Sequence, residues 1–160
     1  MRSDSQHRAR DLFEQAHRAH MKGELHRAVE LYKDSLEIHP TPEAHTYLGW
    51  TYHDLGKADA AIAECKLAIA LDPDFGNPYN DIGAYLIDMG RYDEAIPWLE
   101  RALEAPRYDP RHFPYFNLGR AYVAKGNLSR AHQYFRDALR IEPGYGLARQ
   151  AVERLRRMMN

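Results

Sequence analysis

The chain of 160 residues contains a single cysteine, Cys65, so a fold held together by internal disulfides is excluded. It contains no run of eighteen apolar residues, and its formal net charge is only −1. Neither feature favours a membrane or a nucleic acid as partner. The first residues, 1–8, are polar and lack the apolar stretch of a signal peptide. We therefore expect a cytoplasmic protein with no nucleic-acid and no membrane partner.

Catalytic and cofactor motifs are missing as well. The sequence has no Walker phosphate loop, no HExxH, no CxxC and no G-x-S-x-G turn. His17, His20 and His53 fall at related positions and could converge on a zinc-like ion, which takes three or four N or S ligands. We favour the alternative, a polar surface lined by these histidines without a metal. The prediction is a protein that is not an enzyme and has no cofactor.

The sequence does contain a strong internal repeat. Four glycines are each followed five positions later by an alanine: Gly23 and Ala28, Gly56 and Ala61, Gly90 and Ala95, Gly126 and Ala131. Successive alanines are 33, 34 and 36 residues apart. A period of this length is typical of stacked supersecondary units, each of which packs on its neighbours.

Each unit has the pattern of two helices. Between Glu43 and Leu55, apolar or small residues recur at steps of three and four, which indicates one face of an amphipathic helix. Gly56 ends this helix, because glycine adopts a left-handed conformation without a steric clash. A second helix with the same pattern follows from residue 61 and stops before Pro73, since proline disfavours a helical residue ahead of it. The prediction is an antiparallel helix pair per unit.

The units share an order of residues that includes Leu48-Gly49-x-x-Tyr52 and Leu118-Gly119-x-x-Tyr122, followed by the glycine, the alanine and a closing proline. This order resembles the tetratricopeptide repeat (TPR) family. The resemblance implies an all-α, right-handed solenoid of four helix-turn-helix repeats with a C-terminal capping helix, in a single domain over residues 1–160. The repeats are expected at residues 9–41, 42–75, 76–111 and 112–145, and the capping helix at 146–159.

The resemblance also predicts where a partner binds, because in this family the first helix of each repeat lines a concave groove. The matching residues form our candidate partner-binding groove: Phe13, His17, His20, Tyr47, Trp50, His53, Asn80, Asp81, Ile87, Phe116, Asn117 and Arg120. Trp50 is the candidate anchor, because tryptophan, tyrosine and arginine dominate binding hot spots. The alternative is that Trp50 packs in the core between two helices.

The known ligand sites of the family narrow the expected function. The clamp of lysines, asparagines and an arginine that holds chaperone tails is not matched, since its places hold Phe13, His17, Tyr47, Asn77 and Asp81. We therefore predict a non-enzymatic adaptor or scaffold that binds a peptide or helix of another protein, and not a chaperone-tail receptor.

Two other functions stay open. Residues 1–80 carry 9 Lys/Arg against 13 Asp/Glu, and residues 81–160 carry 13 against 10, so the ends could stack into a weak homo-oligomer. In addition, Leu12, Phe13 and Ala16 have no preceding unit to cover them. The long junction at residues 104–110, which we expect to bulge from the surface, together with Asn-Leu-Gly at 117–119, is similar to bacterial pilus-assembly repeat proteins and favours a pilus or secretion assembly factor.

Overall fold

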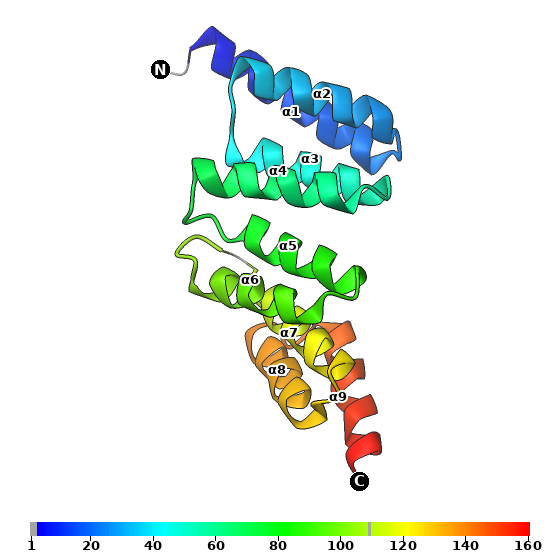
Figure 1. Ribbon diagram of the computed structural model, residues 1–160. Coiled ribbons are helices and arrows are strands. Elements are labelled where there is room, and N and C mark those ends of the chain that lie inside the picture. The colour runs from blue at the N-terminus through cyan, green and yellow to red at the C-terminus, as the bar shows by residue number, and fades with distance from the viewer. Residues whose placement is uncertain (1–2, 109) are drawn as a thin grey trace.

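A computed structural model describes residues 3–108 and 110–160 of the chain. Within these ranges the chain forms nine α-helices, arranged as four antiparallel pairs and a last single helix (Figure 1). Their bounds are α1 Asp4–Met21, α2 Leu25–Ile38, α3 Pro42–Asp54, α4 Ala58–Leu71, α5 Asn77–Asp88, α6 Tyr92–Glu104, α7 His112–Ala124, α8 Leu128–Ile141 and α9 Gly146–Met159. The predicted all-α solenoid of helix pairs is confirmed.

The first helix of every pair ends in the same turn. Gly56 has a φ of +78°, and its N–H donates to the carbonyl of His53 at 2.9 Å. The next N–H, of Lys57, donates to the carbonyl of Tyr52 at 2.8 Å. These two bonds satisfy carbonyls that the end of α3 leaves open. Glycines with φ between +76° and +79° occupy the equivalent place in the other pairs: Gly23, Gly90 and Gly126.

The two helices of a pair approach closely where the sequence has small residues. A Cβ added to Gly83 would lie 2.4 Å from Leu99 Cδ2, and one added to Gly119 would lie 2.4 Å from the ring of Phe135. Each large side chain therefore fills the space that the opposite glycine leaves open. Cys65 is fully buried at such a contact, and its burial raises the pKa of the thiol, which disfavours the reactive thiolate.

The core runs along the stack, between one helix pair and the next. One cluster joins the first two pairs and includes Tyr32 and Leu48. A longer cluster runs from α4 to α9 and includes Leu99, Phe135 and Leu155. Because Leu155 is buried in this cluster, α9 covers the last apolar face of the array.

The beginning of the array is less open than we expected. Ala16 is fully buried, and Leu12 and Phe13 are partly buried although no pair precedes them. Phe13 packs on Tyr32 of α2, with ring centres 5.7 Å apart. The expectation of an uncovered apolar face on α1 is wrong for Ala16, because α2 shields it.

The described part of the junction between α6 and α7 does not bulge, which corrects a second expectation; Asp109 lies outside the described residues. Ala105 and Tyr108 are buried, and the Tyr108 ring packs where a Cβ on Gly76 would lie. The N–H of Arg107 donates to the carbonyl of Asp74 at 3.0 Å, and the N–H of Gly76 donates to the carbonyl of Arg107 at 3.0 Å. This segment therefore lies along the connection between α4 and α5 (Figure 1).

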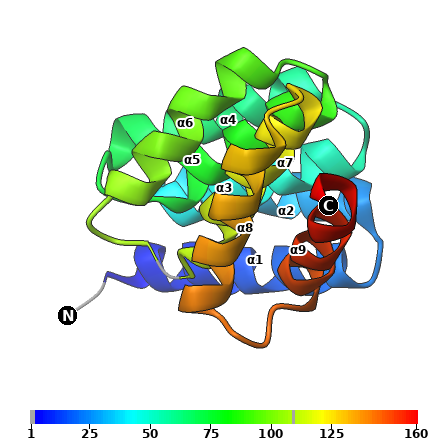
Figure 2. The same ribbon diagram turned by 90° about the horizontal axis from the view of Figure 1, so that it is seen from below.

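The helices divide into two sets. The backbones of the first helices, α1, α3, α5 and α7, lie close to one another along the stack, whereas those of α2, α4, α6 and α8 are farther apart. We call the surface formed by the first helices the inner face, and the surface formed by the second helices the outer face. In the view from below, α8 runs in a clearly different direction from α1, so successive pairs rotate along the stack (Figure 2). Among the described residues, no helix has the length and apolar character needed to cross a membrane.

Candidate functional site

The inner face begins with a group of rings from α1 and α3, which we call the aromatic cluster: Phe13, His17, Tyr47 and Trp50. Tyr47 lies at its centre, with ring centres 5.3 Å from Phe13, 5.3 Å from His17 and 6.1 Å from Trp50. Trp50 is 37% exposed, so its indole is not part of the buried core. The aromatic cluster therefore presents a partly solvated apolar surface.

His20 does not line the open surface, although the sequence placed it there. Its side chain is buried between α1 and α3, with Nε2 2.6 Å from Asp54 Oδ2 and Nδ1 3.1 Å from Thr51 Oγ1. Its ring also contacts Trp50 edge to face, at 4.4 Å between centres. His20 thus supports Trp50 from below, and a partner would meet the indole and not the imidazole.

The centre of the inner face carries a chain of side-chain hydrogen bonds, which we call the polar network: His53, Asp88, Arg120, Asn117 and Asn80. His53 Nε2 lies 3.1 Å from one oxygen of Asp88, and Arg120 Nη2 donates to the other at 3.1 Å. Arg120 Nη1 donates to Asn117 Oδ1 at 3.0 Å, and Asn117 Nδ2 donates to Asn80 Oδ1 at 3.0 Å. The polar network joins α3, α5 and α7.

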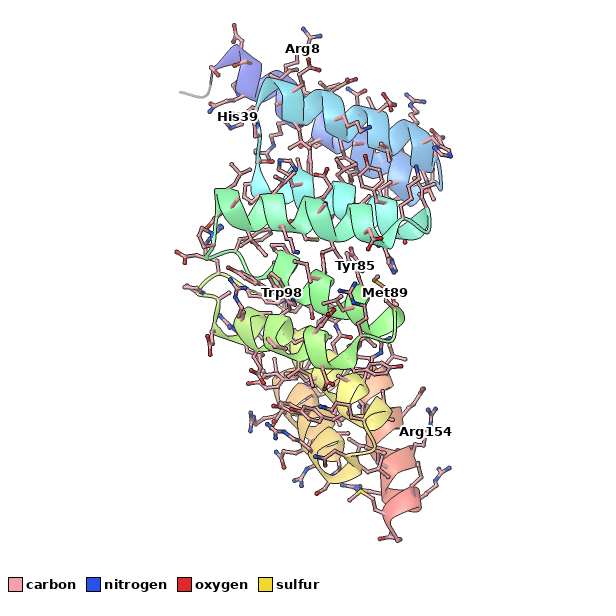
Figure 3. The ribbon with its side chains drawn as sticks, in the orientation of Figure 1. Arg8, His39, Tyr85, Met89, Trp98 and Arg154 are labelled. Atoms are coloured by element: carbon pink, nitrogen blue, oxygen red, sulfur yellow. The ribbon has the colours of Figure 1, made fainter. Side chains whose placement is uncertain are left out.

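The members of the polar network differ in accessibility. Asn80 and Asn117 are buried and hydrogen-bonded to each other. They therefore offer little polar surface to a partner. His53 and Arg120 are partly exposed, and Asp88 is exposed. The His53 ring also stacks on Tyr85 of α5, at 4.4 Å between ring centres (Figure 3 shows Tyr85). A partner would therefore meet His53, Asp88 and Arg120.

Asp81 lies beside Asn80 on α5 and is the carboxyl of this region whose pKa departs from its ordinary value. Burial raises its pKa to about 7, and a hydrogen bond from the Asn80 side chain opposes that shift. Near neutral pH this carboxyl exists in both charge states. The local charge of the inner face therefore depends on pH.

The inner face has a hollow at each end. The first, of about 530 Å³, lies beside α1 and is lined by residues that include Arg10, Phe13, Glu14 and Glu43. Its charges are mixed, and Arg10 and Glu14 bond to each other at 3.3 Å.

The second hollow, of about 470 Å³, lies between α7 and α9, and we call it the C-terminal hollow. Its two charged lining residues are Arg120 and Arg154, and the rest are mostly apolar. Phe116 forms part of its wall, and Ile87, which the sequence placed on the open surface, is buried at its back. Figure 3 shows Arg154 on α9.

Residues of α9 were missing from the predicted groove. Leu147 is 56% exposed and Met158 is 59% exposed, and both line the C-terminal hollow. The family pattern assigns groove positions within repeats only, so it gives none to a capping helix. The apolar residues between 147 and 158 were the sequence feature that could have indicated this surface. Some of them, Val152 and Leu155, are buried, whereas Leu147 and Met158 are exposed.

The three histidines considered for a metal do not converge. His20 bonds to Asp54 and His53 to Asp88, while His17 packs on Tyr47. Among the residues that the structure describes, no group of three or more His, Cys, Asp or Glu side chains is placed to hold a metal ion.

Comparison with known families gives the class of protein. Two tetratricopeptide repeat models match the chain, one over residues 13–74 and the other over residues 74–142. The chain belongs to the tetratricopeptide repeat family, whose fold generally serves protein–protein interaction without catalysis and takes proteins or peptides as partners.

Individual proteins of the family share only moderate sequence identity with the chain. The chain is 27% identical to the type IV pilus assembly protein PilF of Pseudomonas aeruginosa over 121 residues, which are 75% of this chain and 48% of PilF. It is 32% identical over 78 residues to the small glutamine-rich tetratricopeptide repeat-containing protein 2 of Mycosarcoma maydis, which covers 48% of this chain and 22% of that protein. The chain thus spans half or less of these curated relatives.

Solved structures share the fold. The PilF structure superposes with a TM-score of 0.87 at 24% identity, over 94% of this chain and 68% of that one. The MamA structure superposes with a TM-score of 0.73 at 26% identity, over 88% of this chain and 81% of that one.

Proposed function

We propose that this chain is a non-enzymatic adaptor that binds a peptide or helix of another protein along its inner face. The observation that carries the proposal is the position of Trp50, which keeps 37% of its surface exposed while packed on His20 and Tyr47. Partly exposed tryptophans of this kind lose their remaining water when a partner binds, and they rank among the strongest binding hot spots.

The surroundings of Trp50 support this role. His20 is fixed by contacts with Asp54 and Thr51, so the indole rests on a side chain that cannot easily move. Binding then requires little further ordering of the protein, which favours affinity. The aromatic cluster would contact apolar side chains of the partner. His53, Asp88 and Arg120 would select its polar groups.

A variant of Trp50 tests the proposal. Immobilised wild-type chain and the Trp50→Ala variant are compared for proteins captured from cells that express the chain, and the main captured protein is purified for titration. We expect Trp50→Ala to weaken binding by about 2 kcal/mol. The free energy of unfolding should change by only about 1 kcal/mol, because the indole is partly solvated in the free protein.

Arg136→Ala is the matched control, because Arg136 is exposed on α8, away from the inner face. It should bind as the wild type does. Equal binding by the wild type and Trp50→Ala would contradict the proposal. So would a loss of about 3–5 kcal/mol of stability in Trp50→Ala, which is typical of a core aromatic.

A second candidate function is assembly of a pilus or a secretion machine. It is favoured by the similarity to PilF, which extends over 75% of this chain in sequence and 94% in structure. The test is expression of the chain in Pseudomonas aeruginosa that lacks PilF, with pili counted on the cell surface. Restored pili, lost again with Trp50→Ala, would support this function. Cells that make the chain but no pili would exclude it.

Weak self-assembly through oppositely charged ends is the remaining alternative. The exposed apolar residues Met158 and Met159 of α9 favour it, and four arginines against one glutamate make that helix basic. Attraction between charged ends is screened within about 8 Å at physiological ionic strength, so assembly should weaken with salt. Light scattering at low salt and high protein concentration is the measurement, and a monomer there would exclude the alternative.

A further inference from the structure

We propose that the outer face carries a second binding site, distinct from the inner face, for an acidic segment of a partner protein. The site is a hollow of about 690 Å³ between α4 and α6, with residues of α5 at its base. Lys66, Trp98 and Arg101 form one end of it, and we call this end the cationic corner. Figure 3 shows Trp98 on α6.

Aromatic rings hold the positive charges of the cationic corner in place. The Arg101 guanidinium lies 4.8 Å from the centre of the Trp98 ring and 4.8 Å from that of Tyr79. Lys66 Nζ lies 5.9 Å from the Trp98 ring. The Tyr79 hydroxyl donates to the carbonyl of Pro73 at 2.8 Å, which fixes its ring in turn. Such cation–π contacts orient the cations and leave their N–H groups available for an acceptor.

Within the part of the chain that the structure describes, no carboxylate pairs with Lys66 or Arg101. By contrast, Arg10 and Arg120 on the inner face do form ion pairs. The hollow contains two carboxylates, but Glu94 pairs with Arg91, and Asp59 lies at the beginning of α4. The cationic corner therefore attracts a negatively charged group.

The base of the hollow is apolar and favours an apolar side chain of the occupant. Ile82 and Leu86 of α5 are buried at its base, and Ile62 of α4 is partly buried at its side. An apolar side chain of the occupant would shield this base from water. A neighbouring carboxylate of the occupant would accept hydrogen bonds from Arg101 and Lys66. The occupant that fits is a peptide segment with Asp or Glu next to an apolar residue.

The two tryptophans allow each face to be observed separately, because Trp50 lies on the inner face and Trp98 on the outer. In the Trp50→Phe variant, Trp98 is the one remaining indole. A phage-displayed library of short random peptides is selected against this variant, and an enriched peptide is synthesised with blocked ends. We expect enriched sequences to combine Asp or Glu with an apolar residue. Titration of the peptide should change the Trp98 fluorescence, more strongly at low salt.

Charge removal then tests the assigned residues in the same background. The double substitution Lys66→Gln and Arg101→Gln should weaken the peptide by about tenfold or more, since each 1.4 kcal/mol of lost interaction is tenfold in affinity. The matched control is Lys33→Gln with Arg136→Gln, two exposed cations outside the hollow, and it should bind as the parent does. Circular dichroism confirms that each variant is folded. Arg101→Lys, which keeps the charge but loses the planar stacking, should weaken binding less than Arg101→Gln.

Four results would overturn the proposal. The first is a selection that enriches no acidic sequences. The second and third are an unchanged affinity in the Lys66→Gln, Arg101→Gln variant and an equal loss of affinity in the control variant. The fourth is a change in Trp50 fluorescence when the peptide is added to the Trp98→Phe variant. None of them would contradict binding at the inner face, so the two proposals can fail separately.

Discussion

His20 Nε2 and Asp54 Oδ2 lie 2.6 Å apart, and this contact ties α1 to the end of α3 beneath the indole of Trp50. The imidazole is almost completely buried, whereas the carboxylate is partly exposed. The first two repeats are therefore joined by a polar contact as well as by their apolar cluster.

The first prediction concerns this contact. His20→Ala should lower the free energy of unfolding by about 1–3 kcal/mol, because it removes a buried hydrogen-bonding group and leaves its partners unsatisfied. His17→Ala is the control, since His17 is partly exposed and forms no hydrogen bond within the described structure; it should change stability by less than about 1 kcal/mol. Urea denaturation measures both. Equal losses would show that the contact adds nothing to stability.

A second prediction concerns the close approach of α5 and α6. Gly83→Ala places a methyl group 2.4 Å from Leu99 Cδ2, and overpacking of this kind typically costs about 1–3 kcal/mol. Gly146→Ala is the matched change, because no atom lies within 4 Å of its added Cβ. Alanine is the better helix former, so Gly146→Ala should leave stability unchanged or raise it by up to about 1 kcal/mol. Thermal unfolding distinguishes the two. A Gly83→Ala variant as stable as the wild type would refute the close approach.

A third prediction concerns the segment between α6 and α7. Tyr108→Ala should destabilise the chain by about 3 kcal/mol or more, because it empties the space that the ring fills against Gly76. Arg107→Ala removes an exposed ion pair with Asp72 and should change stability by only about 0–1 kcal/mol. Proteolysis of the native protein gives a local readout, and Tyr108→Ala should be cleaved faster near residues 104–110. Similar cleavage of both variants would mean that the ring does not hold this segment.

The fourth prediction concerns pH. Asp81 titrates at about 7 in the folded chain and near 3.8 when exposed, so the folded state holds this proton more tightly. Its contribution to stability is fully present below about pH 4 and is lost as pH rises to about 7. Since one pKa unit corresponds to about 1.4 kcal/mol, the loss should be on the order of a few kcal/mol.

Asp81→Asn isolates this effect, because the amide does not ionise. The difference in free energy of unfolding between wild type and Asp81→Asn should shift in favour of the variant between about pH 4 and about pH 7, and then stay constant. Denaturation of both proteins across that range is the measurement. A difference independent of pH would mean that Asp81 keeps its ordinary pKa when folded.

The fold was predictable because its determinants are local and repeated. Gly56 and its equivalents end helices through a backbone conformation that glycine favours, and the apolar spacing on either side indicates the helices. The segment at residues 104–110 was not predictable in this way. Tyr108 packs against Gly76, which lies far away in sequence, and the loop itself has the composition of an exposed junction.

The candidate site was predictable only in part, for a related reason. The pattern gives the helix face on which a residue lies but not the partner from the next repeat. His20 and His53 hold equivalent positions, yet His20 is buried against Asp54 while His53 stays accessible beside Asp88. The C-terminal hollow depends on the orientation of α9, which decides which of its apolar residues are buried and which line the hollow. The repeat pattern does not determine that orientation.

The polar network has a mechanical consequence. Hydrogen bonds connect α3, α5 and α7 along one side of the array, whereas the second helices on the other side approach one another less closely. The inner face of the array should therefore resist stretching more than the outer face does. When the array flexes, the bonded inner face keeps its length, and the change in curvature appears as opening or closing of the spaces between the second helices.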